Sequence, residues 1–273
     1  MPEGHVVERV AREHTERFRG QRLRVSSPQG RFVEGAALLD GHVLLGVSAL
    51  GKHSLHRFAA DGDARSRNDL YLHVHLGLYG KWSGASLPVP DPVGAIRVQL
   101  VGDDGWAQLR GATACEVITA PEVRDLRARL GEDPLHSKEG GAKAYSRLSG
   151  SSRAIALALM DQTVTAGVGN AYRAEILFRH GLWPFTPSSQ ISPELWSQLW
   201  TDLQRLMRAG VREGRMVTTE RADRTRRSGP AREDDQYYVY RRAGLACRRC
   251  GTPIAVQDLA GRNLFWCPSC QAA

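Results

Sequence analysis

The 273 residues predict an α+β multidomain fold, with a β-rich first half, a helical second half and a small metal-binding module at the end. Three observations predict it. Short β-type runs broken by Gly, Pro and Asp fill residues 21–118. Helical periodicity dominates residues 144–212. Two C-x-x-C pairs close the chain. The β-rich half is expected to be an antiparallel sandwich or a barrel, and the helical half to be all-α.

One amphipathic helix is expected to open the chain, because apolar residues recur at near-helical spacing over residues 3–18 and Gly20 follows as a helix stop. A short helix and a segment rich in helix breakers then separate the two halves. The predicted domains are 1–120 for the β domain with its helix, 121–143 for a hinge, 144–235 for the helical domain and 236–273 for the zinc module.

The charge of the chain favours a polyanionic partner. Lys and Arg number 37 against 29 Asp and Glu, for a formal net charge of +8 and a pI near 9.6, and basic residues gain affinity for nucleic acid by releasing counterions. A merely basic protein is the alternative. Residues 212–249 contain eleven Arg and six acidic residues, which predicts a flexible cationic loop.

The sequence has no membrane signal. No run reaches the roughly 18 apolar residues that span a bilayer, and the polar start lacks a signal-peptide core. We therefore expect a cytoplasmic protein without a membrane partner.

The cysteines predict one structural zinc ion. Sixteen residues separate the C-x-x-C pair Cys247 and Cys250 from the pair Cys267 and Cys270, which is the spacing of a tetrahedral site. Four thiolates leave no open coordination position, so the metal is expected to fold a hairpin and to do no chemistry. Four free or redox cysteines are the alternative. Cys115 is interpreted as a buried structural thiol.

Two segments of the second half could meet phosphates. Residues 159–172 read as two helices joined by a glycine-rich turn, with Asn170 as a candidate N-cap of the second helix, where exposed backbone N–H groups suit an anion. An ordinary helix cap is the alternative. Arg262 is expected at the tip of the zinc hairpin, within reach of a phosphate. A solvated arginine explains its position equally well.

Three motifs then carry a resemblance that covers essentially the whole chain. They are Met1-Pro2-Glu3-Gly4, the run from Leu159 to Asn170, and the ending from Val239 to Cys270. Together, in this order, they resemble the formamidopyrimidine-DNA glycosylase and endonuclease VIII family. The resemblance implies an N-terminal β-sandwich, a helix–two-turn–helix domain and a zinc finger, with damaged DNA held between the halves. It also implies a bifunctional DNA glycosylase and AP lyase of base-excision repair.

The resemblance further implies that Met1 is removed and that the amine of Pro2 attacks the sugar. An α-amino group has a pKa near 8, so roughly a tenth of it is unprotonated at pH 7, far more than of an ordinary lysine. Glu3 is the expected general acid and base, although a glutamate at a helix start can simply complement the helix dipole. Lys52 matches the family's hairpin lysine, which contacts phosphate and assists catalysis. Outside that context it would be a surface lysine.

A flipped base leaves a gap in the stack that the enzyme must fill. Leu78 and Tyr79, in His75-Leu-Gly-Leu-Tyr-Gly80, match the intercalating loop of the endonuclease VIII branch. The end of a plain β-strand is the competing interpretation. Asn170 and Arg262 carry over as the pair that grips the phosphates around the flipped nucleotide.

The sequence also departs from the family. His5 and Val6 replace the usual proline and second glutamate, and Glu8 is a candidate substitute for that acid. Residues 102–110 lack the paired arginines of the oxidised-purine branch, which favours oxidised pyrimidines over 8-oxoguanine or formamidopyrimidine. Gly77 stands where a polar wedge residue can occur, which suggests weaker discrimination of the opposite base.

We expect a monomer. Two rival functions remain at this point: a non-catalytic zinc-dependent DNA-binding protein, and a zinc-ribbon module of the translation or transcription machinery.

Overall fold

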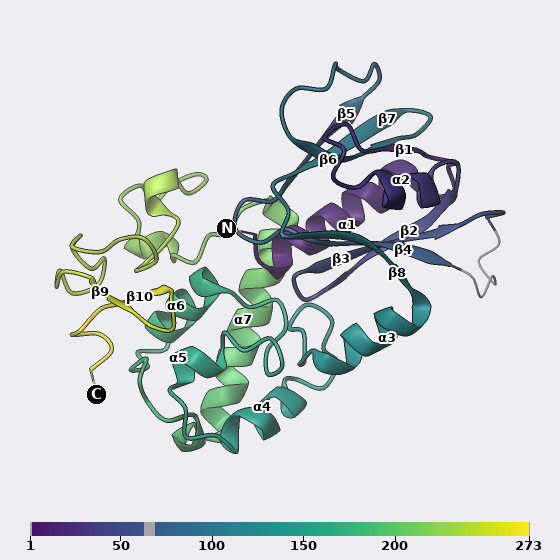
Figure 1. Cartoon of the computed structure of the whole chain (residues 1–273). Helices are drawn as coiled ribbons and strands as arrows, with labels where there is room; N and C mark the ends of the chain where they lie inside the picture. The colour runs from purple at the N-terminus through teal and green to yellow at the C-terminus, as the bar shows by residue number, and fades with distance from the viewer. Residues whose placement is uncertain (1, 63–68, 273) are drawn as a thin grey trace. The chain divides into compact units, whose positions relative to one another are not determined.

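The computed structural model describes residues 2–62 and 69–272 and divides into two compact units, 1–129 and 130–273. Met1 lies outside the described residues. Figure 1 shows strands and helices together in the first unit and mainly helices in the second. The elements of the N-terminal unit are α1 (Gly4–Phe18), β1 (Arg24–Ser26), α2 (Val33–Leu39), β2 (Val43–Leu50), β3 (His53–Ala59), β4 (Leu70–His75), β5 (Lys81–Ser86), β6 (Ile96–Val101), β7 (Gly105–Arg110), β8 (Ala114–Thr119) and α3 (Ala120–Arg129).

The strands of the N-terminal unit form a β-sandwich. One antiparallel sheet has the order β1-β6-β7-β5 and the other the order β2-β3-β4-β8. Alternate residues of β4, Leu72 and Val74, share one core with Val98 and Leu100 of β6. Both sheets therefore bury one face against the other, as a period of two residues in a strand requires. The sandwich alternative is confirmed and the barrel is not.

Helix α1 begins and ends close to where the sequence predicts. Val7, Ala11 and Phe18 are buried along one side of it, at the spacing that places residues on one helix face. The chain turns after the helix at Gly20, whose φ of +82° favours glycine.

The C-terminal unit is helical and ends in a two-stranded hairpin. A membrane-crossing helix, which would have to be both long and apolar, does not occur in the ranges that the structure describes. The elements of this unit are α4 (Ala142–Ser149), α5 (Ile155–Ala158), α6 (Asn170–Arg179), η1 (Ser188–Gln190), α7 (Pro193–Glu213), η2 (Arg221–Asp223), η3 (Glu233–Asp235), β9 (Ala255–Asp258) and β10 (Asn263–Trp266).

Helix α7 is the longest element and has clear end signals. Ser192 accepts a hydrogen bond from Leu195 N at 3.2 Å, Pro193 follows at the first helical position, and Gly214 ends the helix with φ +70°. One face of α7, which includes Trp200 and Met207, is buried in the core of the unit.

Two segments that composition marks as irregular are held by buried or half-buried carboxylates. Glu132, within the segment predicted as a hinge, accepts hydrogen bonds from the backbone N–H groups of Gly141, Lys143 and Ala144 at 3.0–3.1 Å and so caps α4. Asp235, within the predicted cationic loop, is fully buried and pairs with Arg248 at 2.9 Å. The loop therefore has more internal bonding than its composition predicts.

Candidate functional site

The chain start places the buried carboxyl residue Glu3 directly after Pro2. Pro2 is half-buried, and Glu3 is only 1% exposed. Glu3 is also the N-cap residue of α1, and its carbonyl accepts a hydrogen bond from Val6 N at 2.9 Å. The N-terminus of a helix favours negative charge. The position of Glu3 therefore favours the ionised form of its carboxylate.

His5 and Val6, which replace the family's usual proline and second glutamate, differ in burial. His5 is buried, and burial lowers its pKa to about 4, so its ring is neutral at pH 7. Val6 is half-buried. Glu8, the candidate substitute for the missing acid, is buried to 8% exposure and accepts a hydrogen bond from Arg12 Nε at 2.7 Å. A second buried acid therefore does occur in the first two turns of α1.

Lys52 lies in the tight turn between β2 and β3. Leu50 pairs with His53 across the turn, and Gly51 has φ +59°. The positive charge of Lys52 contributes, after burial, to lowering the pKa of both His53 and His75. Lys52 therefore directly precedes His53 in the turn, and His53 pairs with His75 on β4.

A turn closed by two glycines follows β4. Gly77 has φ +66°, and a Cβ added there would lie 1.8 Å from Thr113 Oγ1. A Cβ at Gly80 would lie 2.2 Å from the carbonyl oxygen of Leu76, to which Gly80 N donates at 2.8 Å. The positive φ of Gly77 and the Thr113 hydroxyl, which would have to move, both favour glycine at the position where a polar wedge residue can occur.

The turn presents two large apolar side chains. Leu78 is 49% exposed and Tyr79 is 84% exposed. They follow the end of β4 and precede β5, so they belong to a turn and not to a strand end. Exposed apolar side chains on a backbone with little freedom are suited to insertion between bases.

Asn170 is not the N-cap that the sequence suggests. It is the first residue of α6, and Gly169 is the N-cap. The Asn170 side chain is 5% exposed; its Nδ2 donates to the carbonyl oxygen of Asn263 at 2.9 Å, and its Oδ1 accepts a hydrogen bond from Arg173. Its amide is committed to strand β10, which explains why it does not cap its own helix.

Arg262 lies in the turn between β9 and β10, as predicted. Leu259 N donates to the Arg262 carbonyl at 2.9 Å and Gly261 N donates to Asp258 Oδ1 at 3.2 Å. The Arg262 side chain is exposed. Because Asn170 contacts the neighbouring residue Asn263, the start of α6 and the tip of this hairpin lie together within the C-terminal unit.

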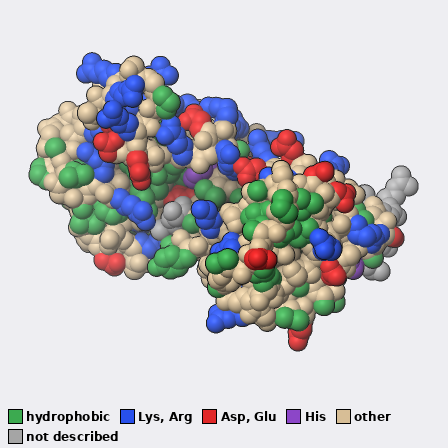
Figure 2. Space-filling view, turned by 90° about the horizontal axis from the view of Figure 1, so that it is seen from above, with side chains coloured by type: hydrophobic (Ala, Val, Ile, Leu, Met, Phe, Trp, Pro, Cys, Tyr) green, Lys and Arg blue, Asp and Glu red, His purple; other side chains and the backbone are tan. Residues whose placement is uncertain are grey.

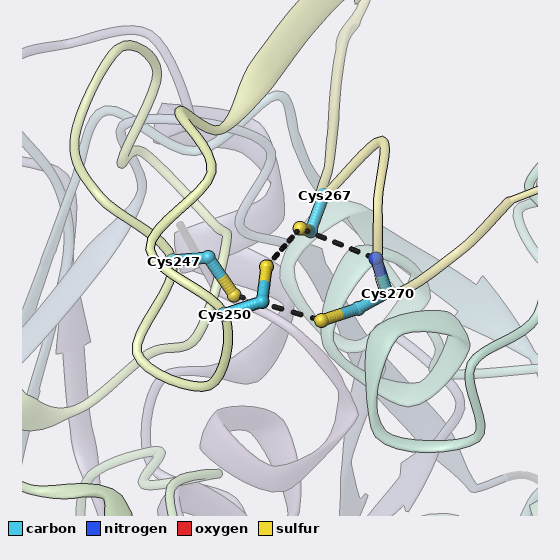
Figure 3. Close-up of side chains that lie close together, drawn as sticks. All are labelled: Cys247, Cys250, Cys267 and Cys270. Atoms are coloured by element: carbon cyan, nitrogen blue, oxygen red, sulfur yellow. Dashed lines mark hydrogen bonds between the residues drawn. The ribbon is translucent and has the colours of Figure 1, made fainter.

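Four cysteine sulfurs converge beside the hairpin (Figure 3). All four lie within 4.8 Å of one another. The Cys247 and Cys270 sulfurs are 3.9 Å apart, and those of Cys250 and Cys267 are 3.4 Å apart. A ZnS₄ tetrahedron with bonds of about 2.3 Å has edges of about 3.8 Å, so this set fits one zinc ion.

The backbone supports the same metal site. Arg249 N donates to Cys247 Sγ and Cys270 N donates to Cys267 Sγ, each at 3.4 Å. Such bonds stabilise thiolate charge, which zinc ligation requires. The protein therefore binds one structural zinc ion through these four cysteines. Cys115 lies outside this cluster and is half-buried, less than predicted; burial raises its pKa to about 12.

Glu175 is a residue that the sequence analysis missed. It is fully buried in α6, and its carboxylate accepts hydrogen bonds from the backbone N–H groups of Tyr238, Val239 and Tyr240 at 2.7–2.8 Å, as well as from Thr218. The carboxylate thus ties α6 to the chain that leads into the hairpin. The sequence signal that could have identified Glu175 is an acidic residue among the apolar residues of α6.

The surface of the molecule is rich in cations. Figure 2 shows Lys and Arg side chains spread over both units on the face that it presents, with Asp and Glu among them. This agrees with the net charge of +8 and suits contact with a polyanion.

Three family models match consecutive parts of the chain. The formamidopyrimidine-DNA glycosylase N-terminal domain matches residues 1–110, the formamidopyrimidine-DNA glycosylase H2TH domain matches 130–222, and the zinc finger found in FPG and IleRS matches 244–273.

Similar proteins align over the whole chain. Endonuclease 8 1 of Mycobacterium tuberculosis is 44% identical over 275 residues, which cover 99% of this chain and 100% of that protein. The formamidopyrimidine-DNA glycosylase of Thermus thermophilus is 31% identical over 279 residues, which cover 99% and 98%.

Solved structures show the same fold. The Lactococcus lactis Fpg in complex with DNA that contains an abasic site has a TM-score of 0.80 at 24% identity, covering 99% of this chain and 100% of that one. The structure at 24% identity shows the fold alone. The two sequence relatives, at 44% and 31% identity over nearly the full length, also show the family. The chain belongs to the formamidopyrimidine-DNA glycosylase and endonuclease VIII family of base-excision repair enzymes, and it is a DNA glycosylase with AP lyase activity.

Proposed function

We propose that the amine of Pro2, exposed by removal of Met1, attacks C1′ of the damaged nucleotide. The secondary amine forms an iminium with the sugar, the damaged base leaves, and the acidified neighbouring proton is lost in the elimination that cuts the strand. The observation that supports this proposal is the burial of Glu3, the residue that follows Pro2, at the N-terminus of α1.

Glu3 is the proposed proton donor and acceptor. Glu3 is almost fully buried, which restricts the movement of its carboxylate. General acid–base catalysis needs a carboxylate that stays within hydrogen-bond reach of the proton it transfers. Lys52 is the proposed phosphate contact and assists catalysis from the turn between β2 and β3. The tight turn, with Gly51 at φ +59°, limits where the Lys52 ammonium can go.

Two further pairs hold the DNA in this proposal. Leu78 and Tyr79 enter the stack where the damaged base leaves it, and their exposure on a glycine-closed turn supports that role. Asn170 and Arg262 grip phosphates near the flipped nucleotide. The contact of Asn170 with Asn263, the neighbour of Arg262, supports their action as one unit.

We propose oxidised pyrimidines as the preferred lesions, with 8-oxoguanine and formamidopyrimidine as the second candidate. The region that carries paired arginines in the oxidised-purine branch has one arginine here, Arg110. Its guanidinium donates to Gln108 Oε1 at 2.8 Å and to Ser83 Oγ at 3.1 Å. Those bonds commit it to the β5–β7 sheet, so it is poorly suited to fill a gap in DNA. Endonuclease 8 1 as a 44% identical relative supports the same branch.

The test is base release under single-turnover conditions. Duplexes that carry one 5,6-dihydrouracil or one 8-oxoguanine are incubated with excess enzyme. We expect faster release of the pyrimidine, and loss of release in Glu3→Gln with Glu13→Gln as the exposed control on the same helix. Faster release of 8-oxoguanine contradicts the lesion preference, and an unchanged Glu3→Gln rate contradicts the role of Glu3.

We also propose that the protein acts as a cytoplasmic monomer. One chain carries every residue assigned above, so a single copy suffices for both steps.

A further inference from the structure

Three histidines and a glutamate occupy one face of the β2-β3-β4-β8 sheet, next to Lys52. His53 of β3 pairs with His75 of β4, and His73 of β4 pairs with Glu116 of β8. Because His73 and His75 are two residues apart on one strand, they point to the same face. The His53 ring centroid is 5.0 Å from that of His73 and 4.9 Å from that of His75.

Hydrogen bonds join three of these residues in a row. His73 Nδ1 lies 2.8 Å from Glu116 Oε1, and His73 Nε2 lies 2.8 Å from His53 Nδ1. His73 is buried, whereas the side chain of Glu116 is 57% exposed. The row therefore runs from a solvated carboxylate, through a buried imidazole, to the half-buried ring beside Lys52.

The carboxylate determines where the protons lie. A carboxylate only accepts hydrogen bonds, so His73 Nδ1 carries a proton and donates it to Glu116. When the His73 ring is neutral, its Nε2 is the acceptor and His53 Nδ1 donates to it. The remaining nitrogen, His53 Nε2, consequently carries a lone pair and no proton.

The surroundings keep His53 neutral. Burial, followed by electrostatic interactions with His73, His75, Arg129 and Lys52, lowers the pKa of His53 to about 3. These groups come from β4, from the end of α3 and from the turn before β3, and Glu116 faces the row from β8. His73 bonds both Glu116 and His53 and so links the carboxylate to the His53 ring.

We propose that Glu116, His73 and His53 form a hydrogen-bonded positioning network for Lys52, in which the carboxylate fixes both rings so that His53 offers a lone pair to the lysine ammonium. A neutral acceptor orients an ammonium without cancelling its charge, and that charge remains available to a DNA phosphate. A carboxylate in the same place would pair with the lysine and compete with the phosphate. This inference rests on the proposed role of Lys52.

The test compares two substitutions at Glu116. Glu116→Ala removes the acceptor, so the tautomer of His73 is no longer fixed. Glu116→Gln removes the charge and turns one carboxylate oxygen into an NH2 donor, but it keeps one oxygen that can accept from His73 Nδ1. Because Glu116 is exposed, neither variant should change the fold or the melting temperature appreciably. Glu34→Ala, which removes an exposed carboxylate elsewhere in the same unit, is the matched control for net charge.

The first readout is the single-turnover cleavage rate on DNA with one abasic site, at saturating enzyme. We expect a loss of about tenfold in Glu116→Ala, comparable to the loss of a partner that orients a metal-bound histidine. Glu116→Gln should restore most of the rate, and Glu34→Ala should match the wild type. Equal rates for all three variants, beside a slow Lys52→Ala, overturn the network alone. A wild-type rate in Lys52→Ala overturns the role of Lys52 and the network with it.

The second readout needs no activity. Nitrogen chemical shifts of histidine report which ring nitrogen carries the proton. We expect His53 to be protonated at Nδ1 in the wild type and in Glu116→Gln, and to gain the Nε2-protonated form in Glu116→Ala. Protonation at Nε2 in the wild type, or one unchanged tautomer in all proteins, overturns the proposal.

Discussion

The two units hold their proposed DNA-contacting residues by different means. In the N-terminal unit, Leu78 and Tyr79 lie on a turn closed by Gly77 and Gly80. The same unit buries His5 and His56, whose pKa burial lowers. In the C-terminal unit, the hairpin with Arg262 depends on charge, through four thiolates and the buried carboxylate of Glu175. The first unit should therefore respond to acid and the second to metal removal, and both responses can be tested.

Removing zinc should have the largest effect. Structural zinc contributes roughly 10–16 kcal/mol to the folding of small zinc modules, so a chelator or Cys267→Ala should unfold the hairpin and abolish tight DNA binding. The amide exchange of the sandwich should stay the same. Binding is measured by fluorescence anisotropy and exchange by mass spectrometry. Full DNA affinity in the metal-free protein contradicts the structural role of the metal.

Glu175→Ala should have the next largest effect. It leaves three buried backbone N–H groups without their acceptor, at roughly 1–3 kcal/mol for each. We expect faster amide exchange across residues 236–242 and weaker DNA binding. Glu213→Ala, at an exposed position on α7, is the control and should change stability by less than about 0.5 kcal/mol. Equal exchange in the two variants would contradict the anchoring role.

Acid should destabilise the N-terminal unit. Burial lowers the pKa of His5 and of His56 from 6.5 to about 4. Their stabilising contribution is therefore complete above pH 6.5 and is lost as the pH falls toward 4. Each shift corresponds to roughly 3 kcal/mol. Urea unfolding, followed by exchange in sandwich peptides, should show lower stability at pH 4.5 than at pH 7. A free energy of unfolding that is equal at both pH values refutes this explanation.

Arg262→Ala should weaken DNA binding uniformly across sequences. Losing one phosphate contact should reduce the slope of log affinity against log salt by about 1. Arg241→Ala, which removes a cation stacked on the Tyr240 ring, is the control. Titrations at several salt concentrations measure both slopes. If the two variants have the same slope as the wild type, Arg262 is not a phosphate contact.

The wedge substitutions should have the smallest effect. Leu78→Ala and Tyr79→Ala should slow base release several-fold from duplex DNA and hardly at all from single strands, because only a duplex has a stack to fill. Both side chains are exposed, so stability should hold within about 0.5 kcal/mol. The ratio of the two rates is the measurement. An unchanged ratio would mean that another residue fills the gap.

Local sequence patterns correctly predicted the features of the fold that are determined by neighbouring residues. The start and stop of α1, the two-sheet core and the convergence of the four cysteines follow from periodicity, glycine and spacing, and each matches the structure. These local patterns could not predict hydrogen bonds between side chains that are far apart in the sequence. Asn170 looked like a helix cap, but its amide bonds a strand 93 residues further along the chain. Likewise, the bonds that join His53, His73 and Glu116 depend on strand register, which spacing within one segment does not give.

The central claim, attack by the Pro2 amine, is tested most directly by borohydride trapping. The wild type and Pro2→Gly, both with confirmed removal of Met1, are incubated with an oligonucleotide that carries one abasic site, reduced, digested and mapped by mass spectrometry. We expect a covalent DNA adduct on the N-terminal peptide that is greatly weakened in the variant. An adduct on a lysine peptide, or no adduct despite tight DNA binding and a full zinc site, would contradict the mechanism.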